Sequence, residues 1–394
     1  MRGNYFQQRS DAMSRALKSF ADYFRRLDKV LWILLIAIST YGLLLVASAT
    51  RESTENYFFT QLLATLLGYA GAIVLTLIDY RAIANYWYLV AGFSIFLIIY
   101  TLLFGTAATG DAGVNARAWI ILPGGVSFQP SELVKIGFMV TFSKHLSAVK
   151  SRGLITHPLH VVLLGCHALI PVALVHFQGD DGAAVIFFCM FLAMSFAAGV
   201  QLRYFIGLIG AGLIAAPLAW QFVLEDYQKR RIINMMNPEA DPLGDGLQQL
   251  QGKISIGSGR LWGQGLFQGP RVENNRVPLQ HSDFIFSVAG EELGFIGCML
   301  IIVLLFLLLL RLLYIARRSA DDIGTYLCFG FFALIASQAI FNIGMCLSLL
   351  PVIGVTLPFF SAGGSSAACL YLGFGLVENV YMHRFEGDKV HVQL

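Results

Sequence analysis

The chain has 394 residues, of which 57% are hydrophobic and only 13% are charged. Soluble domains usually carry about 25% charged residues, so lipid is the expected solvent for most of this chain. The formal net charge of +3 is too small to indicate nucleic-acid binding, and no nucleic-acid partner is expected.

Ten apolar segments are long enough to cross a bilayer, which takes roughly 20 residues per helix. In chain order they are 30–49, 57–78, 86–104, 131–148, 159–177, 182–200, 203–223, 283–315, 325–349 and 357–383. The segment 131–148 matches the pattern least well, because Glu132, Lys135 and Lys144 interrupt it. The predicted fold is an all-α polytopic membrane protein with about ten transmembrane helices.

Lys and Arg residues in short loops mark the cytoplasmic side of a membrane protein. Assigning the basic N-terminal segment 1–29 to that side leaves the short outer loops with little positive charge beyond Arg51 and Arg117. Ten spans with both termini in the cytoplasm are therefore self-consistent. No cleavable signal peptide is expected, and the first helix would serve as its own anchor.

The polar segment 224–282 lies between the seventh and eighth predicted helices and is expected outside the cell. Structureless loops beyond about 15 residues are uncommon, and long ones are often functional. We expect it to pack across the outer face, with one short surface helix at 247–257. The expected organisation is a cytoplasmic N-terminal segment (1–29), helices 1–7 (30–223), a large extracellular loop (224–282), helices 8–10 (283–383) and a cytoplasmic tail (384–394).

Charged side chains gather at the predicted outer ends of the helices. An unpaired ionisable group at membrane depth costs at least about 2.5 kcal/mol, so each is a functional candidate. The candidates are Glu132 with Lys135, Asp180 with Asp181, the basic cluster Lys229, Arg230 and Arg231, and Asp283 with Glu291 and Glu292. The sequence predicts that they converge on a pocket that opens to the outside.

Several of these groups also have a purely structural interpretation. Asp283 could cap the helix that follows it, because helix N-termini favour acidic residues. Glu132 and Lys135 are three residues apart on one helix face and could form a structural ion pair. Asp180 could belong to a tight turn. These alternatives remain open from the pattern alone.

Residues closer to the membrane surface have alternatives of the same kind. The basic cluster 229–231 could contact lipid headgroups, and Trp119 could belong to an aromatic belt at the membrane interface. His281 is expected to be a solvated loop residue. The six cysteines occur singly in apolar runs, so they predict neither a zinc site nor a disulfide framework.

Four stretches, in the correct order, resemble motifs of the SEDS family (shape, elongation, division and sporulation), whose members include RodA, FtsW and SpoVE. They are SFQPSELVK (127–135), the segment from Arg231 to Gly265, HSDFIFSVAGEELG (281–294) and LPFFSAGGSS (357–366). The chain departs from the family pattern at Gly179, where a proline is usual, and at Thr60, where a Lys or Arg is usual. It also has Ala118 where some members keep an Arg. The changes at Thr60 and Ala118 remove basic groups near the predicted outer loops.

The resemblance implies a peptidoglycan glycosyltransferase of the bacterial cytoplasmic membrane. Such enzymes polymerise lipid II into glycan strands at the outer face, with inversion at C1 and release of undecaprenyl pyrophosphate, for elongation or division. The expected partners are lipid II, the nascent glycan strand, membrane lipid and a class B penicillin-binding protein that crosslinks the strands. The alternative is a lipid II flippase, although charges concentrated on the outer half favour the enzyme.

The resemblance also assigns roles to residues. Asp283 would be the catalytic base that takes the proton of the acceptor hydroxyl, a role that suits a partly desolvated carboxylate. Basic side chains would stabilise the leaving pyrophosphate. The implied substrate-binding residues are Lys135, Glu132, Arg117, Trp119, Asp180, Arg231, Arg230, Glu292 and Ser365. A divalent cation, Mg²⁺ or Mn²⁺, is compatible with this chemistry, and no organic cofactor is expected.

Overall fold

The computed structural model describes residues 23–53, 56–107, 117–122, 127–236 and 246–385. Most of the predicted tails 1–29 and 384–394, with Arg15 and Lys18, lie outside these residues. The long helices are α2 (Lys29–Ala49), α3 (Tyr57–Thr76), α5 (Trp87–Phe104), α6 (Pro130–Ser151), α7 (Pro158–Phe177), α8 (Asp181–Ala198), α9 (Leu202–Phe222), α13 (Ile285–Arg317), α14 (Asp322–Cys346) and α15 (Gly364–Met382). Each of the ten predicted segments corresponds to one of these helices.

Eight of the described helices are long and apolar enough to cross a membrane by length and composition. The other two long helices, α6 and α15, carry buried charges such as Glu132 and Glu378. Other helices surround both of them: α15 packs along α3, and α6 packs between α5 and α14. Protein contacts replace lipid around these charges, which explains how helices of lower hydropathy fit into the bundle.

Several predicted helix ends differ from the observed ones by two or three residues, and the start of the last helix differs by seven. The last helix begins at Gly364 and not at residue 357, because residues 357–363 form a turn in which Phe359 has a φ of +67°. The eighth predicted helix begins at Ile285 and not at residue 283, so the boundary of the domain 283–383 also shifts. A break at Gly294, with φ 65° and ψ −159°, divides α13. Both differences fall where the backbone leaves helical geometry near the outer loops.

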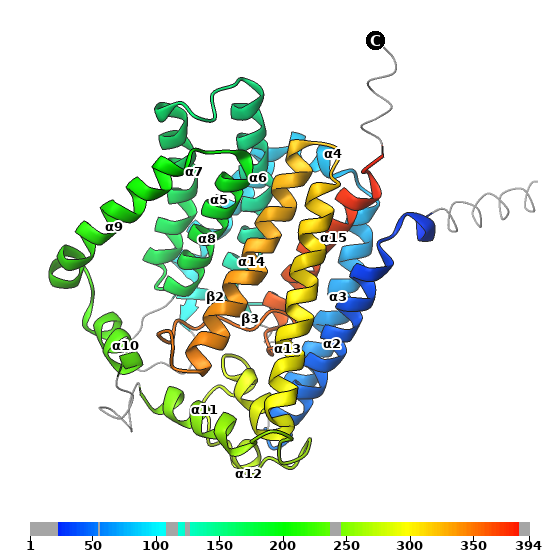
Figure 1. Cartoon of the computed structure of the whole chain (residues 1–394), viewed down its shortest axis with the longest axis vertical. Helices are drawn as coiled ribbons and strands as arrows, with labels where there is room; N and C mark the ends of the chain where they lie inside the picture. The colour runs from blue at the N-terminus through cyan, green and yellow to red at the C-terminus, as the bar shows by residue number, and fades with distance from the viewer. Residues whose placement is uncertain (1–22, 54–55, 108–116, 123–126, 237–245, 386–394) are drawn as a thin grey trace, which may run out of the picture.

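The polar segment 224–282 contains more regular structure than the sequence predicts. The predicted surface helix at 247–257 is confirmed as α11 (Leu247–Ser258). Two further helices, α10 (Asp226–Met236) and α12 (Pro270–Glu273), were not predicted. All three lie together at the lower end of the bundle in Figure 1.

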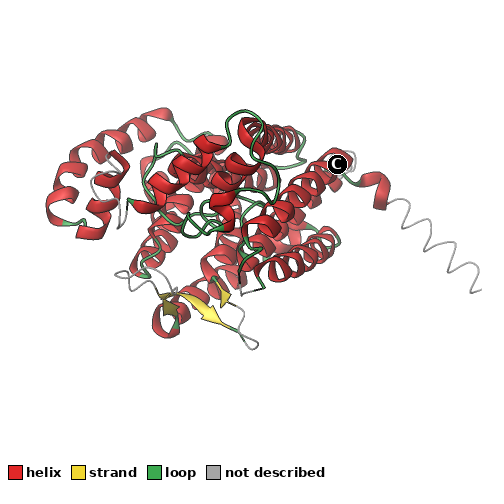
Figure 2. Cartoon of the chain, turned by 90° about the horizontal axis from the view of Figure 1, so that it is seen from below, coloured by secondary structure: helices red, strands yellow, loops and turns green. Residues whose placement is uncertain are grey.

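A small antiparallel sheet, also not predicted, lies between α5 and α6. Its order is β1 (Thr106–Ala107), β2 (Arg117–Ile121) and β3 (Ser127–Phe128). Thr106 pairs with Trp119, and Ile120 pairs with Phe128. Figure 2 shows the strands at the edge of the helical bundle. The sheet leads directly into α6, whose first turn carries Glu132.

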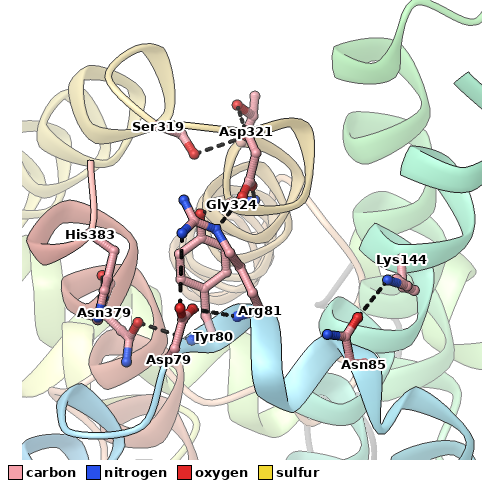
Figure 3. Close-up of polar contacts among 11 residues, drawn as sticks. Asp79, Tyr80, Arg81, Asn85, Lys144, Ser319, Asp321, Gly324, Asn379 and His383 are labelled. Atoms are coloured by element: carbon pink, nitrogen blue, oxygen red, sulfur yellow. Dashed lines mark hydrogen bonds and ion pairs between the residues drawn. The ribbon is translucent and has the colours of Figure 1, made fainter. Parts of the chain in front are cut away.

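The upper end of the bundle in Figure 1 holds the short helix α4 (Tyr80–Asn85) and both ends of the described chain. Side chains from three segments bond to one another there (Figure 3). Arg81 Nε and the Tyr80 hydroxyl donate to Asp321 Oδ2 at 2.7 and 2.8 Å. The Tyr80 amide donates to Asn379 Oδ1 at 3.1 Å. We call these four residues the upper latch, because they join α4, α14 and α15.

Candidate functional site

Asp283 lies half-buried in the turn that precedes α13. Its backbone carbonyl accepts a hydrogen bond of 2.8 Å from Asn342 Nδ2 on α14, and the same nitrogen donates to the carbonyl of Val355 at 2.7 Å. The cap residue of α13 is Phe284, so Asp283 lies one residue before the cap position. Asn342 therefore fixes the position of Asp283 against the loop that follows α14.

The same loop holds the two residues before Asp283. The Ser361 hydroxyl donates to the Ser282 carbonyl at 2.5 Å, and the Ala362 amide donates to the His281 carbonyl at 2.8 Å. The His281 ring stacks on Tyr57 with a centroid distance of 4.2 Å. His281 is therefore part of the packed site, and its expected role as a solvated loop residue is wrong.

A second polar cluster lies at the N-terminal end of α6. Lys135 Nζ and Glu132 Oε1 form an ion pair at 2.8 Å, and the two residues are 1% and 6% exposed. The predicted pairing is confirmed. Removing a charge pair from water is costly unless its geometry is good, so this pair is a fixed element of the helix. Lys135 can touch a ligand only if the pair opens.

Asp180 joins this cluster from the turn between α7 and α8. Its Oδ1 accepts from the Ala183 amide at 2.9 Å, which confirms the turn interpretation and caps α8. Its Oδ2 accepts from Gln129 Nε2 at 2.7 Å and from the Ser131 hydroxyl at 3.3 Å. Burial raises the pKa of the Asp180 carboxyl, while the Ala183 amide and the charge of Lys135 act in the opposite direction.

Ser365, at the start of α15, contacts this second cluster. Its hydroxyl oxygen accepts a hydrogen bond from the Gln129 amide at 3.2 Å. The neighbouring Gly363 amide donates to Gln61 Oε1 on α3 at 3.0 Å. The motif around Ser365 therefore links α3, α15 and the start of α6.

The loop 347–363 connects the Asp180 cluster with Asp283. At one point it passes so close to α8 that a Cβ on Gly182 would lie 2.3 Å from the Ile353 carbonyl oxygen. One residue later, a Cβ on Gly354 would lie 3.8 Å from Asp283 Oδ2. The loop therefore lies against the start of α8, next to Asp180, and against Asp283; the convergence of all the charged groups on one pocket stays a prediction.

Glu291 and Glu292 bind residues of α12 and α2. Glu291 Oε1 accepts from the Arg271 amide at 2.7 Å, and Glu292 Oε1 accepts from the Ser48 hydroxyl on α2 at 2.6 Å. Both glutamates are nearly inaccessible, at 0% and 1% exposed. They hold α12 and α2 against the first half of α13, next to Asp283.

The basic cluster lies on α10 and not in an irregular loop. The Tyr227 hydroxyl and Gln228 Nε2 donate to Asp181 Oδ2 at 3.1 and 2.7 Å, which ties α10 to the start of α8. Arg231 lies over the Tyr227 ring at 5.5 Å, and Arg230 is exposed. Burial, followed by the charge of Asp181, raises the pKa of Tyr227 to about 12. The cluster is therefore anchored one residue away from Asp180.

Arg117 and Trp119 lie on β2, which packs against α5 and α6. Arg117 is exposed, Trp119 is half-buried, and the Trp119 carbonyl accepts from the Thr106 hydroxyl at 3.3 Å. Within the described chain, Arg117 and Trp119 pair with Ala107 and Thr106 of β1, in the same sheet. The structure thus places them beside α6 without joining them to Asp283.

An apolar groove of about 380 Å³ lies between α7, α8 and α9, with Leu164, Phe191 and Leu208 among its lining residues. No residue of α9 is buried, and Figure 1 shows this helix standing away from the bundle at the left. The lining residues of α7 end at Val172, short of Asp180. The groove is therefore separate from the polar clusters described above.

Comparisons with known proteins were made on the sequence and on the fold. Residues 28–386 match the family FtsW/RodA/SpoVE, described as cell cycle proteins. The chain is 33% identical to the peptidoglycan glycosyltransferase MrdB of Escherichia coli K12, with 91% of this chain and 94% of the relative covered. It is 34% identical to a probable peptidoglycan glycosyltransferase FtsW of Trichlorobacter lovleyi, with 90% and 92% covered.

Solved structures of similar fold point to the same group of proteins. A chain from a peptidoglycan synthase complex that coordinates polymerization and crosslinking superimposes with a TM-score of 0.79 at 29% identity, covering 91% of this chain and 99% of that one. The rod shape determining protein RodA of Thermus thermophilus gives a TM-score of 0.67 at 26% identity, covering 91% and 98%.

Proposed function

The chain belongs to the FtsW/RodA/SpoVE family of cell cycle proteins, and from this premise we propose that it is a peptidoglycan glycosyltransferase that polymerises lipid II. The relatives that carry this activity in their names are matched over about nine-tenths of the chain. The reaction transfers a growing glycan from its polyprenyl pyrophosphate to the 4-hydroxyl of an acceptor sugar.

Asp283 is the proposed catalytic base. Its carboxylate takes the proton of the acceptor hydroxyl while that oxygen attacks C1 of the donor. The bond from C1 to the pyrophosphate oxygen breaks in the same step, and the pyrophosphate leaves with its electron pair. A single displacement of this kind inverts C1 and needs one base. The half-buried position of Asp283 supports the role, because the carboxylate is partly desolvated and still accessible.

Charges around the loop 347–363 would bind the donor pyrophosphate. Arg230 and Arg117 are both exposed, so an anionic ligand could approach their guanidinium groups from solvent. Lys135 is held by Glu132, so in this proposal its charge acts mainly by positioning Asp180 and Gln129. Preorganised cations of this kind stabilise the charge that develops on a leaving group.

A bound Mg²⁺ or Mn²⁺ would add positive charge on the pyrophosphate. Within the described residues, no group of three or more His, Cys, Asp or Glu side chains is arranged to hold a metal ion. The residues therefore do not form a resident metal site, and we derive no step through a metal. A cation of this class would arrive with the substrate.

We further propose that the lower end of Figure 1 faces the outside of a bacterial cytoplasmic membrane. The basic N-terminal residues support this orientation, because cytoplasmic segments are enriched in Lys and Arg. A transpeptidase of the class B penicillin-binding proteins is the proposed partner, since the similar solved chain comes from a complex that both polymerises and crosslinks.

One observation carries the proposal: loop 347–363 contacts Asp283 on one side and the start of α8, next to Asp180, on the other. The decisive experiment is polymerisation of purified lipid II by wild type and Asp283→Asn, with and without the transpeptidase. Wild type should make glycan and the variant should make none. A protein that moves labelled lipid II across vesicles without making glycan would instead be a flippase.

A further inference from the structure

A second groove lies far from the proposed active site, between α2 and the C-terminal half of α13. It has a volume of about 260 Å³ and is lined by Val30, Leu34, Leu307, Leu310, Arg311 and Tyr314. Val30 and Leu310 are 49% and 47% exposed, so the groove opens sideways to the surrounding membrane. Its length runs along two transmembrane helices that lie side by side in Figure 1. Its apolar walls suit an acyl chain.

The polar end of the groove is basic. Arg311 donates to Asp28 with Nε and Nη2 at 2.7 and 2.8 Å. Neither of these two hydrogen bonds uses Nη1, so this nitrogen takes no part in holding Asp28. The Tyr314 ring lies between two guanidinium groups, at 4.2 Å from Arg311 and 5.0 Å from Arg318. Two guanidinium groups therefore pack against the Tyr314 ring at this end of the groove.

The charges at this end are segregated by depth. The acids Asp28 and Glu378 are 1% and 0% exposed, so they lie beneath the surface. The exposed basic side chains close to this end in sequence are Arg25, Lys29, Arg317 and Arg318. The acids that follow them, Asp321 and Asp322, are paired with Arg81 and Lys150. A ligand that enters from the membrane therefore meets positive charge at the end of an apolar channel.

We propose that this groove binds one anionic glycerophospholipid from the leaflet that contains the N-terminal end of α2. An acyl chain would lie along Leu34 and Leu307, and the phosphate would contact Arg311, Arg318 and the Tyr314 hydroxyl. Basic pockets between transmembrane helices bind anionic headgroups in this way. The lipid would span α2 and α13, the two helices that Glu292 joins at their opposite ends.

Native mass spectrometry of the full chain in detergent tests the proposal, with dioleoylphosphatidylglycerol and dioleoylphosphatidylcholine as probes. Wild type should retain one phosphatidylglycerol in preference to phosphatidylcholine. Leu307→Trp fills the groove, and Arg318→Gln removes an exposed cation. Arg318→Gln should lower phosphatidylglycerol affinity about fivefold, the effect expected for one basic residue near an anionic membrane surface. Leu307→Trp should abolish retention, because the indole occupies the place of the acyl chain.

Two variants serve as matched controls. Leu300→Trp changes another exposed leucine of α13 outside the groove, and Arg203→Gln removes an exposed cation at the start of α9, away from the groove. Both should retain the lipid as wild type does. Equal retention of the two lipids by wild type would overturn the proposal. So would unchanged retention in both groove variants, which would leave the groove to a transmembrane helix of a partner.

Discussion

Replacing Asn342 by Ala should displace Asp283 without changing its carboxylate, and so tests whether the position of Asp283 matters for the reaction rate. Asn342 Nδ2 donates to the carbonyls of Asp283 and Val355, and Asn342 is completely buried. The Val355 carbonyl left without this donor costs about 1–3 kcal/mol, whereas the Asp283 carbonyl keeps a weaker donor, the Cys346 thiol at 3.6 Å. The free energy of unfolding should therefore fall by roughly 1–4 kcal/mol. A displaced base also reacts more slowly, and a shift of about 1 Å can cost about 100-fold in rate.

The matched control is Asn379→Ala at the opposite end of the bundle. Asn379 is also completely buried, and its Nδ2 donates to the carbonyls of Leu75 and Ile78. It accepts from the Tyr80 amide in the upper latch (Figure 3). The loss of stability should therefore be at least as large as for Asn342→Ala. The polymerisation rate per folded molecule should stay close to that of wild type.

The assay combines thermal unfolding in detergent with lipid II polymerisation at a temperature where both variants remain folded. We expect similar shifts in Tm and a rate loss confined to Asn342→Ala. If both variants polymerise equally well per folded molecule, the hydrogen bonds from Asn342 to the carbonyls of Asp283 and Val355 have no part in catalysis. The reasoning would then be refuted, however large the effect on Tm.

Two further substitutions test the buried supports of the site. Lys135→Met leaves Glu132 as an unpaired buried charge and should lower the free energy of unfolding by about 3–5 kcal/mol. The double variant Lys135→Met with Glu132→Gln should recover most of the Tm but no polymerisation activity. An unchanged Tm in the single variant would contradict the ion pair. Gly294→Ala places a Cβ 2.3 Å from the Gly263 amide nitrogen at a φ of 65°. The variant should therefore have a lower Tm and faster proteolysis of the segment 224–282. A proteolysis rate equal to that of wild type would show that the break in α13 at Gly294 is dispensable.

The local parts of the site could be predicted from the sequence. Glu132 and Lys135 pair because a spacing of three residues puts them on one helix face. Asp180 forms a turn because an Asp before Gly-containing sequence favours one. The ten helices follow from apolar segments of sufficient length. In each case, the residues that decide the structure are near neighbours in the chain.

The remaining features depend on contacts between distant segments. Asn342 reaches Asp283 across 59 residues, and no local pattern marks an amide in α14 as its partner. Ser361 lies in the motif LPFFSAGGSS, so the sequence did mark it as a candidate. Its place in a turn was missed, because a helix was predicted from residue 357. The break at Gly294 escaped prediction because a glycine within an apolar run has no hydropathy signature.

The upper latch has a mechanical consequence for the whole bundle. The bonds of Arg81, Tyr80 and Asn379 hold α4, α14 and α15 together at one end, so relative displacement of these helices there would break several of them at once. At the other end, helices that belong to none of the spans cover the bundle. Helix movements that admit a bulky substrate should therefore pivot about Asp321 and grow in amplitude toward Asp283. Pairs of spin labels placed at successive levels of α3 and α14 would detect this gradient. Their distance distributions should broaden from the upper latch toward loop 347–363.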